Sequence, residues 1–493
     1  YTEFPGGYNP DFGADINDFA VVIGASGELA GGWSWDVRGR TAENEVEYVL
    51  SDTINPSLGR LSPLSFRPGT LTQEESSLNA DVVKPVEIAA LAAPLNVAFG
   101  MELRNETYKI GAGDPASRAV GPTAAVFGLG SDGFQGFPLE SAGSFESDSV
   151  AAYVDLETNL TEKLSGGVAL RFEDFDTFGS TADWKVAARY EFTPAFALRA
   201  TANTGFRAPT PGQINTLNVT TTADTSGNLI PSGTYPVNHP VAMALGAEPL
   251  DAEESMNFTF GVIYQPFERT WVTLDYYDIE IEDRLALRNV TIGPAEVAQL
   301  AAAGVEDANL LLGSLANFFT NAFDSNVTGI DLAVTSTFDA GPGELVVDLR
   351  HNYNKQEVDN VAAATINASR VFDLENQVPN NRSTLTFTYQ TPRRFSALLR
   401  LNHFGSWETT GGLFSPGDAS DVSSYSAEML VDLEATLTFA ENYDLTIGGE
   451  NVLDTYPEDE QNPVLQFLGV RYALTSPFGF NGGFYYVRFA ARF

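Results

Sequence analysis

The chain has 493 residues, 65 acidic and 27 basic side chains, a net charge of −38 and no cysteine. This composition excludes disulfides and thiolate metal sites, and it argues against a nucleic-acid partner, because such binding depends on Lys and Arg neutralising phosphates. Only three histidines are present, and no run of the sequence approaches the roughly 20 apolar residues of a membrane-spanning helix.

Many short segments of the chain alternate apolar and polar residues. In "WKVAARYEF" (184–192) every second residue from the tryptophan is apolar or small, and the residues between them include Lys185, Arg189 and Glu191. A strand places successive side chains on opposite faces, so the pattern predicts strands with one apolar face. We count about seventeen such segments, most near the 9–11 residues with which a tilted strand crosses a bilayer. Further examples are 198–206, 345–353, 397–404, 429–439 and 484–493.

The connections between these segments alternate in length. The short set contains the turn-forming residues of hairpins and comprises 193–196, 266–270, 339–343, 391–394 and 440–443. The long set comprises 105–147, 207–254, 285–325, 354–380, 405–427 and 454–481, and 177–181 is a short link where a long one is due. Nothing in the architecture of a soluble β-sandwich requires short and long connections to alternate in this way. We therefore predict an all-β transmembrane antiparallel barrel, with short periplasmic turns and long extracellular loops.

Two further features fit this fold. Residues 293–319 are rich in Ala and Leu, which predicts one or two short helices inside a long loop. Aromatic pairs such as Tyr276 and Tyr277, 318–319, and Tyr485 and Tyr486 flank strands and are candidates for interfacial girdles, although aromatics favour strands in any protein.

Several segments resemble the barrel domain of TonB-dependent outer-membrane receptors. Segment 178–210 is the most specific, because it ends in a signature of that family at Gly205, Phe206, Arg207, Ala208 and Pro209. Segments 250–262, 326–334 and 448–457 resemble later motifs in the expected order, and the terminal Phe493 is similar to the aromatic residue that ends the family's last strand. Residues 7–40 resemble an earlier barrel hairpin.

The resemblance implies a barrel of about 22 strands, filled by an N-terminal plug that carries the segment contacting TonB. Neither the plug nor that segment is visible here, so we expect residues 1–493 to be the C-terminal barrel portion of a longer receptor. The implied function is active import of a scarce ligand, such as a metal chelate, a glycan or another small molecule. The alternative is a closed barrel of about 16 or 18 strands that acts as a passive, porin-like channel.

The resemblance also implies a location and partners. The location is the bacterial outer membrane, where lipid and lipopolysaccharide surround the barrel. The barrel-assembly machinery would insert it, the TonB complex would act through the plug, and a surface lipoprotein is a further possible partner.

Arginines at the polar, bore-facing positions are candidates to contact an anionic ligand or the plug. We expect most of them to pair with acids of the bore, of which Glu191, Asp348, Asp432 and Glu434 are available. The candidate positions are Arg189, Arg199, Asn203, Arg350, Arg400 and Arg488, together with Arg207, which we expect just beyond the end of its strand.

The sequence predicts no enzyme and no cofactor. No Ser-His-Asp spacing stands out, because His351 and His403 lie at outward-facing strand positions and His239 lies in a proline-flanked loop. The acidic segments 173–176 and 457–460 could bind Ca²⁺, but they lack an ordered ligand spacing, and solvated loops are the simpler interpretation.

Overall fold

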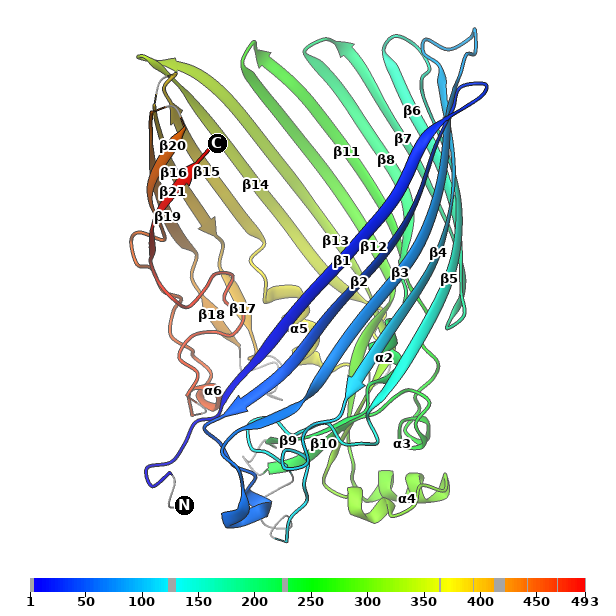
Figure 1. The fold of residues 1–493 in the computed structure, drawn as a ribbon, viewed down its shortest axis with the longest axis vertical. Coiled ribbons are helices and arrows are strands. Elements are labelled where there is room, and N and C mark those ends of the chain that lie inside the picture. The colour runs from blue at the N-terminus through cyan, green and yellow to red at the C-terminus, as the bar shows by residue number, and fades with distance from the viewer. Residues whose placement is uncertain are drawn as a thin grey trace.

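One large curved sheet dominates the protein (Figure 1). The computed structural model describes residues 4–122, 130–223, 229–362, 365–392, 394–411, 422–440, 442–467 and 469–492. Nineteen strands form this sheet, and two more form a small separate hairpin. The alternating sequence patterns predicted this all-β architecture, which is confirmed.

The strands have the following bounds. They are β1 (Asp11–Leu29), β2 (Trp33–Ser51), β3 (Phe66–Val86), β4 (Leu95–Gly111), β5 (Gly143–Asn159), β6 (Leu164–Phe175), β7 (Gly179–Thr193), β8 (Phe196–Arg207), β9 (Asn218–Ala223), β10 (Leu229–Thr234), β11 (Glu253–Phe267), β12 (Thr270–Thr291), β13 (Leu315–Ala340), β14 (Gly343–Asp359), β15 (Asn381–Gln390), β16 (Phe395–Phe404), β17 (Trp407–Thr409), β18 (Ser423–Tyr425), β19 (Glu428–Phe439), β20 (Tyr443–Glu450) and β21 (Phe484–Ala491).

Seventeen of these strands form the wall, in chain order and all antiparallel, and this number agrees with the count from the sequence. Each wall strand pairs with the next, and the wall passes directly from β8 to β11 and from β16 to β19. Strands β9 and β10 belong to a loop instead, and β10 pairs in parallel with the start of β13.

The wall strands are longer than predicted. The expected 9–11 residues fit β15 and β16, whereas β3 has 21 residues, β12 has 22 and β13 has 26. The extra length lies toward the long loops, so the predicted loop 285–325 shrinks to 292–314 and the predicted loop 105–147 to 112–142. Strand pairing continues beyond the apolar band, where the alternation of apolar and polar residues no longer indicates a strand.

The connections sort by length as predicted. The short turns lie at one end of the wall and the long loops lie at the other, with the described N-terminal residues (Figure 1); the short link between β6 and β7 is the exception and lies at the loop end. Segment 178–210 forms the predicted hairpin β7–β8, and β1–β2 forms the earlier hairpin predicted within 7–40. The short link after β6 is also confirmed, because β7 begins at Gly179.

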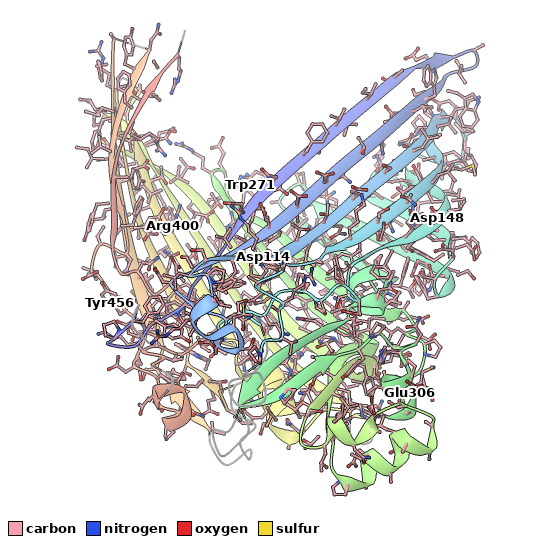
Figure 2. The ribbon with its side chains drawn as sticks, turned by 60° about the horizontal axis from the view of Figure 1, so that its bottom comes forward. Asp114, Asp148, Trp271, Glu306, Arg400 and Tyr456 are labelled. Atoms are coloured by element: carbon pink, nitrogen blue, oxygen red, sulfur yellow. The ribbon has the colours of Figure 1, made fainter. Side chains whose placement is uncertain are left out.

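The two edges of the wall are separated. Figure 2 shows an opening between β1 and the C-terminal strands, and no pairing joins β1 to β21 within the described ranges. Both strands run from the loop end to the turn end, so they point in the same direction. Direct closure of the wall would therefore create a parallel pair.

Short helices fold the long loops into compact units. They are η1 (Pro56–Leu61), α2 (Pro211–Asn215), α3 (Pro240–Ala244), α4 (Pro294–Ala302), η2 (Ala308–Leu311), α5 (Ala368–Asn376) and α6 (Pro463–Phe467). None of the described helices has the length and apolar character needed to cross a membrane. The helical prediction within 293–319 is confirmed by α4 and η2, except that its end belongs to β13.

A loop core packs α3 and α4 against the start of β13. Val241, Leu300 and Phe318 are among its buried residues. Phe318 is fully buried there, so its assignment to an interfacial girdle was wrong. The predicted girdle positions of Tyr277 and Tyr486 were also wrong, because each ring lies across a glycine of the adjacent strand.

Three tyrosines brace the bore face in the same way. Each ring lies across a glycine of the adjacent strand, where an added β-carbon would collide with it, in the pairs Tyr153–Gly100, Tyr277–Gly329 and Tyr486–Gly448. The hydroxyl then reaches the strand after that one. Tyr153 donates to Asp81 at 2.8 Å, Tyr486 donates to Glu434 at 2.7 Å, and Tyr277 accepts from Asn352 at 3.1 Å. Each tyrosine thus links three strands.

Candidate binding site in the bore and at its mouth

The outward face of the wall is apolar and exposed. Met101 on β4, Leu170 on β6 and Val487 on β21 expose 58%, 59% and 70% of their surfaces. Soluble monomers rarely leave apolar patches of this extent uncovered. Aromatics gather near the turns of this face, for example Tyr190 and Phe192 with ring centroids 4.6 Å apart. This face has the chemistry of a surface covered by lipid.

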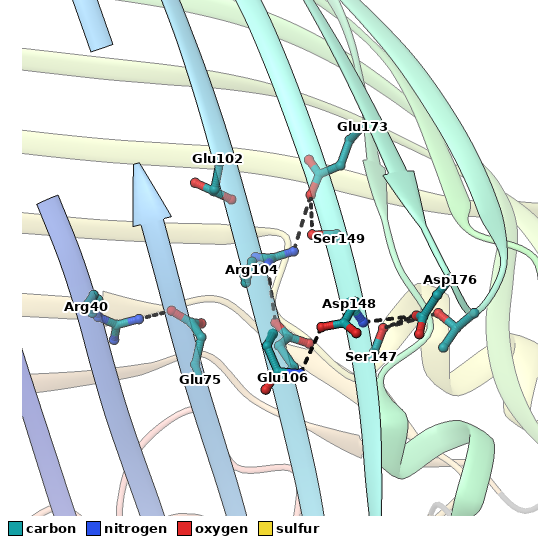
Figure 3. A network of polar contacts seen from close by, with 12 residues as sticks. Arg40, Glu75, Glu102, Arg104, Glu106, Ser147, Asp148, Ser149, Glu173 and Asp176 are labelled. Atoms are coloured by element: carbon teal, nitrogen blue, oxygen red, sulfur yellow. Dashed lines mark hydrogen bonds and ion pairs between the residues drawn. The ribbon is translucent and has the colours of Figure 1, made fainter. Parts of the chain in front are cut away.

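The opposite face carries a ladder of ion pairs. In the part shown in Figure 3, Arg104 contacts Glu173 at 3.5 Å, and Ser149 donates to the same carboxylate at 3.2 Å. On neighbouring strands Arg40 bonds Glu75, and Arg171 bonds Glu173 at 2.7 Å. The bases in this part of the face therefore each have an acidic partner along the wall.

Each of the predicted bore arginines has an acidic partner. The pairs are Arg189–Glu191 at 3.2 Å, Arg199–Asp275 at 2.6 Å, Arg207–Glu253 at 2.6 Å, Arg350–Asp348 at 2.7 Å, Arg400–Asp432 at 3.7 Å and Arg488–Glu434 at 3.1 Å. Asn203 donates to the carbonyl of Thr204 at 3.2 Å. The expected pairing with bore acids is thus observed, and contact of these residues with a ligand stays a prediction.

The signature residues anchor the end of β8. Ser255 of β11 donates to the carbonyl of Gly205 at 3.2 Å, and Phe206 packs edge-on against Phe175. Arg207 is the last residue of β8 and not just beyond it, as the sequence suggested. Ala208 and Pro209 lead into α2, whose capping box joins Thr210 and Gln213. Phe493 lies outside the described residues.

Each of the two acidic segments contains one buried carboxylate. Glu173 lies inside β6, is only 3% exposed and pairs with Arg104 and Arg171. Glu460 is also buried and accepts a bond from the Tyr425 hydroxyl at 2.9 Å. Burial, together with this carboxylate, raises the pKa of Tyr425 to about 12. Nowhere in the described ranges do three or more His, Asp or Glu side chains gather as metal ligands would.

The histidines occupy three different settings. His351 of β14 lies 2.8 Å from the Ser383 hydroxyl, a pair that sequence spacing did not reveal. In the described part of the chain no carboxylate contacts His351, so this pair lacks the third member of a catalytic triad. His403 flanks Ser383 on the next strand, and His239 caps α3 by accepting the Val241 N–H.

Helices from two long loops lie at the bore mouth. Gly212 of α2 faces the Tyr108 ring of β4, and α5 is tied to β14 because Glu375 accepts the Val358 N–H at 2.9 Å. Asp373 of α5, almost fully buried, accepts bonds from Thr409 and from the amide and hydroxyl of Thr410. These contacts fix α5 between the wall and the neighbouring loop.

Sequence reasoning missed two basic residues at this mouth. Arg284 lies on β12 beside a bulge, and Arg370 lies on α5. The bulge breaks the alternation that would have assigned Arg284 to the bore face, and α5 has only nine residues. No local sequence pattern signals the position of either side chain.

The comparisons identify relatives of this architecture. The chain matches the family described as "TonB dependent receptor-like, beta-barrel" over residues 1–452. No curated protein matches it. Among solved structures it is similar to the siderophore receptor PirA from Acinetobacter baumannii (14% identity, TM-score 0.65) and to a mutant ferric enterobactin receptor PfeA from Pseudomonas aeruginosa (14%, 0.68). It is also similar to the ferric yersiniabactin uptake receptor FyuA from Yersinia pestis (13%, 0.57).

These structural matches cover 97%, 97% and 98% of this chain but only 62%, 62% and 63% of the solved chains. At such low identity they show the fold alone. The family match extends over most of the sequence, and the chain therefore belongs to the TonB-dependent receptor-like β-barrel family.

Proposed function

We propose that this chain is the wall of an outer-membrane, TonB-dependent transporter that imports a scarce nutrient. The ligand class that fits the solved neighbours is a metal chelate, since PirA, PfeA and FyuA are receptors for siderophores or their iron complexes. Glycans and other small ligands are the alternatives. A plug that fills the bore would be pulled by TonB, which draws on the proton gradient across the inner membrane.

The observation that carries this proposal is that the wall of this family member is open, with its two edge strands unpaired to each other in the described residues. The described wall has seventeen strands, and its two edge strands run in the same direction. An all-antiparallel barrel needs an odd number of additional strands to close such a wall. Five more would give the barrel of about 22 strands typical of plugged outer-membrane transporters. Lipid cannot satisfy open strand edges, so in a membrane these edges must be paired.

The bore chemistry supports a filled bore as well. The ion pairs along the wall match the bore arginines with acids, so a folded plug can pack against these arginines without burying them unpaired. A passive channel would instead conduct through this face continuously.

Conductance of the intact protein separates the two functions without knowledge of the ligand. We would purify the full-length polypeptide from outer membranes and insert it into a planar lipid bilayer. A plugged transporter should show no steady conductance until urea loosens the plug, and a protonophore should abolish nutrient uptake in cells. Steady ion current from the untreated protein would instead support the porin-like alternative.

A further inference from the structure

We propose that a groove in the outward face of the wall holds one acyl chain of a membrane phospholipid. The groove crosses β14, β15, β16, β19, β20 and β21, has a volume of 670 Å³ and is lined almost wholly by apolar groups, among them Phe387 and Leu399. This volume lies within the range of about 300–1,000 Å³ that small-ligand sites have. The proposal goes beyond the transport function, because it concerns the outside of the wall and not the bore.

Two small side chains form the floor of the groove. Ala397 of β16 pairs in register with Ala435 of β19. Tyr389 of β15 is the next residue across the sheet from Ala397, and Ile447 of β20 is the next from Ala435. Residues that pair directly across strands share one face, so two methyl groups lie here between two large side chains. The outward face is therefore indented at this point.

Two tyrosine rings form walls of the groove, and hydrogen bonds hold both in place. The Tyr389 hydroxyl donates to the carbonyl of Ala340, and the Tyr485 hydroxyl donates to the carbonyl of Val452, each at 3.2 Å. The Tyr485 ring also lies against Gly449, where an added β-carbon would come within 2.9 Å of it. A groove whose walls are already fixed loses little conformational freedom when a ligand enters.

The lining selects hydrocarbon over a polar ligand. Glu434 is the one charged residue among those that line the groove. Its carboxylate is engaged on the bore side, where it accepts bonds from Tyr486 at 2.7 Å and from Arg488 at 3.1 Å. Because the two tyrosine hydroxyls of the walls are also engaged, the groove offers a ligand chiefly apolar contacts. Such contacts favour an acyl chain through the hydrophobic effect.

The position of the groove on the wall points to a phospholipid of the inner leaflet. Tyr389 and Ala397 lie within two residues of the turn ends of β15 and β16. Aromatic rings gather at the same end, with ring centroids 5.7 Å apart for Phe439 and Tyr443 and 5.9 Å apart for Tyr443 and Phe489. Short turns and an aromatic girdle mark the periplasmic interface of outer-membrane barrels, where the leaflet consists of phospholipid. The groove is continuous with the apolar face that this lipid covers.

Native mass spectrometry of the intact receptor tests the site. We would purify the full-length protein from outer membranes, wash it in a mild non-ionic detergent and add palmitoyl-oleoyl-phosphatidylethanolamine in increasing amounts. The wild-type protein should retain one tightly held phospholipid. Ala435→Phe and Ala397→Phe each fill the floor of the groove and should weaken this binding at least tenfold. Ala152→Phe is the matched control and should bind as the wild type does, because Ala152 is an exposed alanine of the outward face on β5, outside the groove.

The proposal is overturned if the wild type retains no phospholipid, or if both groove variants retain it as firmly as the control. A wild-type dimer that Ala435→Phe dissociates would also overturn it, because the groove would then be a contact between two copies of the chain. Retention of lipopolysaccharide in place of phospholipid would overturn it as well, since lipopolysaccharide belongs to the other leaflet.

Loss of lipid must be distinguished from loss of fold. Heat-modifiable gel migration shows whether each variant has folded, and either groove variant keeps the test valid if the other fails to fold. The measurement requires neither TonB nor a nutrient. Its failure would therefore reject the lipid site and leave the assignment as a transporter unchanged.

Discussion

Replacement of Gly448 by alanine should destabilise the wall through a single steric contact. The ring of Tyr486 on β21 lies across Gly448 on β20, and its hydroxyl donates to Glu434 on β19 at 2.7 Å. An added methyl group would collide with the ring and displace it. Overpacking costs about 1–3 kcal/mol, and loss of a hydrogen bond in this half-buried setting costs about 1 kcal/mol more. We therefore expect the free energy of unfolding to fall by about 2–4 kcal/mol.

Urea unfolding of the intact receptor, followed by gel migration of unheated samples, measures this change. Gly39→Ala is the matched control, because the nearest atom to its added β-carbon is the Ser77 carbonyl oxygen at 3.9 Å. That variant should change stability by less than about 0.5 kcal/mol. In a Tyr486→Ala background the penalty of Gly448→Ala should largely vanish. Equal stability of Gly448→Ala and Gly39→Ala would refute the reasoning, as would an unchanged penalty in the Tyr486→Ala background.

Three further predictions concern the loops and the bore. Asp373→Ala removes the acceptor of three hydrogen bonds, so amide exchange of α5 and residues 407–411 should accelerate roughly 100-fold, and normal protection would contradict this role. Burial lowers the pKa of His239 below its usual 6.5, so the buried ring favours its neutral form; stability of α3 should be complete above pH 6.5 and decline as the pH falls below it. His239→Asn keeps a capping side chain and should abolish this pH dependence of exchange, and a persistent pH dependence would assign it to another group. Arg488→Ala breaks an exposed ion pair at 3.1 Å, so the free energy of unfolding should fall by less than about 1 kcal/mol, while uptake should change. If uptake and ligand affinity stay unchanged in all the bore-arginine variants, these arginines are not a binding set.

The wall was predictable because lipid and water impose opposite demands on its two faces. Residues 184–192 and 198–206 alternate strictly, and β7 and β8 contain them. Strand length was not predictable to the same degree. On β12 the outward face changes from Leu274 to Asp278 and Glu280, so the lipid signal stops while the backbone pairing continues.

The candidate site was harder to predict than the wall, for a different physical reason. Four of the acids that pair with the bore arginines, such as Glu191, were named from the sequence because strand parity places them on the same face. The partners of Arg199 and Arg207, which are Asp275 and Glu253, were not named. The positions of Arg284 and Arg370 depend on tertiary structure, since a bulge redirects the first and a loop helix carries the second. Phe318 shows the same limit, because loop packing and not strand parity determines its burial.

Binding of TonB tests the central claim most directly. We would immobilise the full-length receptor purified from outer membranes and titrate it with the isolated periplasmic domain of TonB from the same organism. Saturable binding at a ratio of one to one, with the barrel folded by gel migration, is the result that a TonB-dependent transporter predicts. The test is made with and without an extract of nutrient-rich medium, which serves as a source of ligand. A folded receptor that fails to bind TonB at any concentration tested would contradict its assignment as a TonB-dependent transporter.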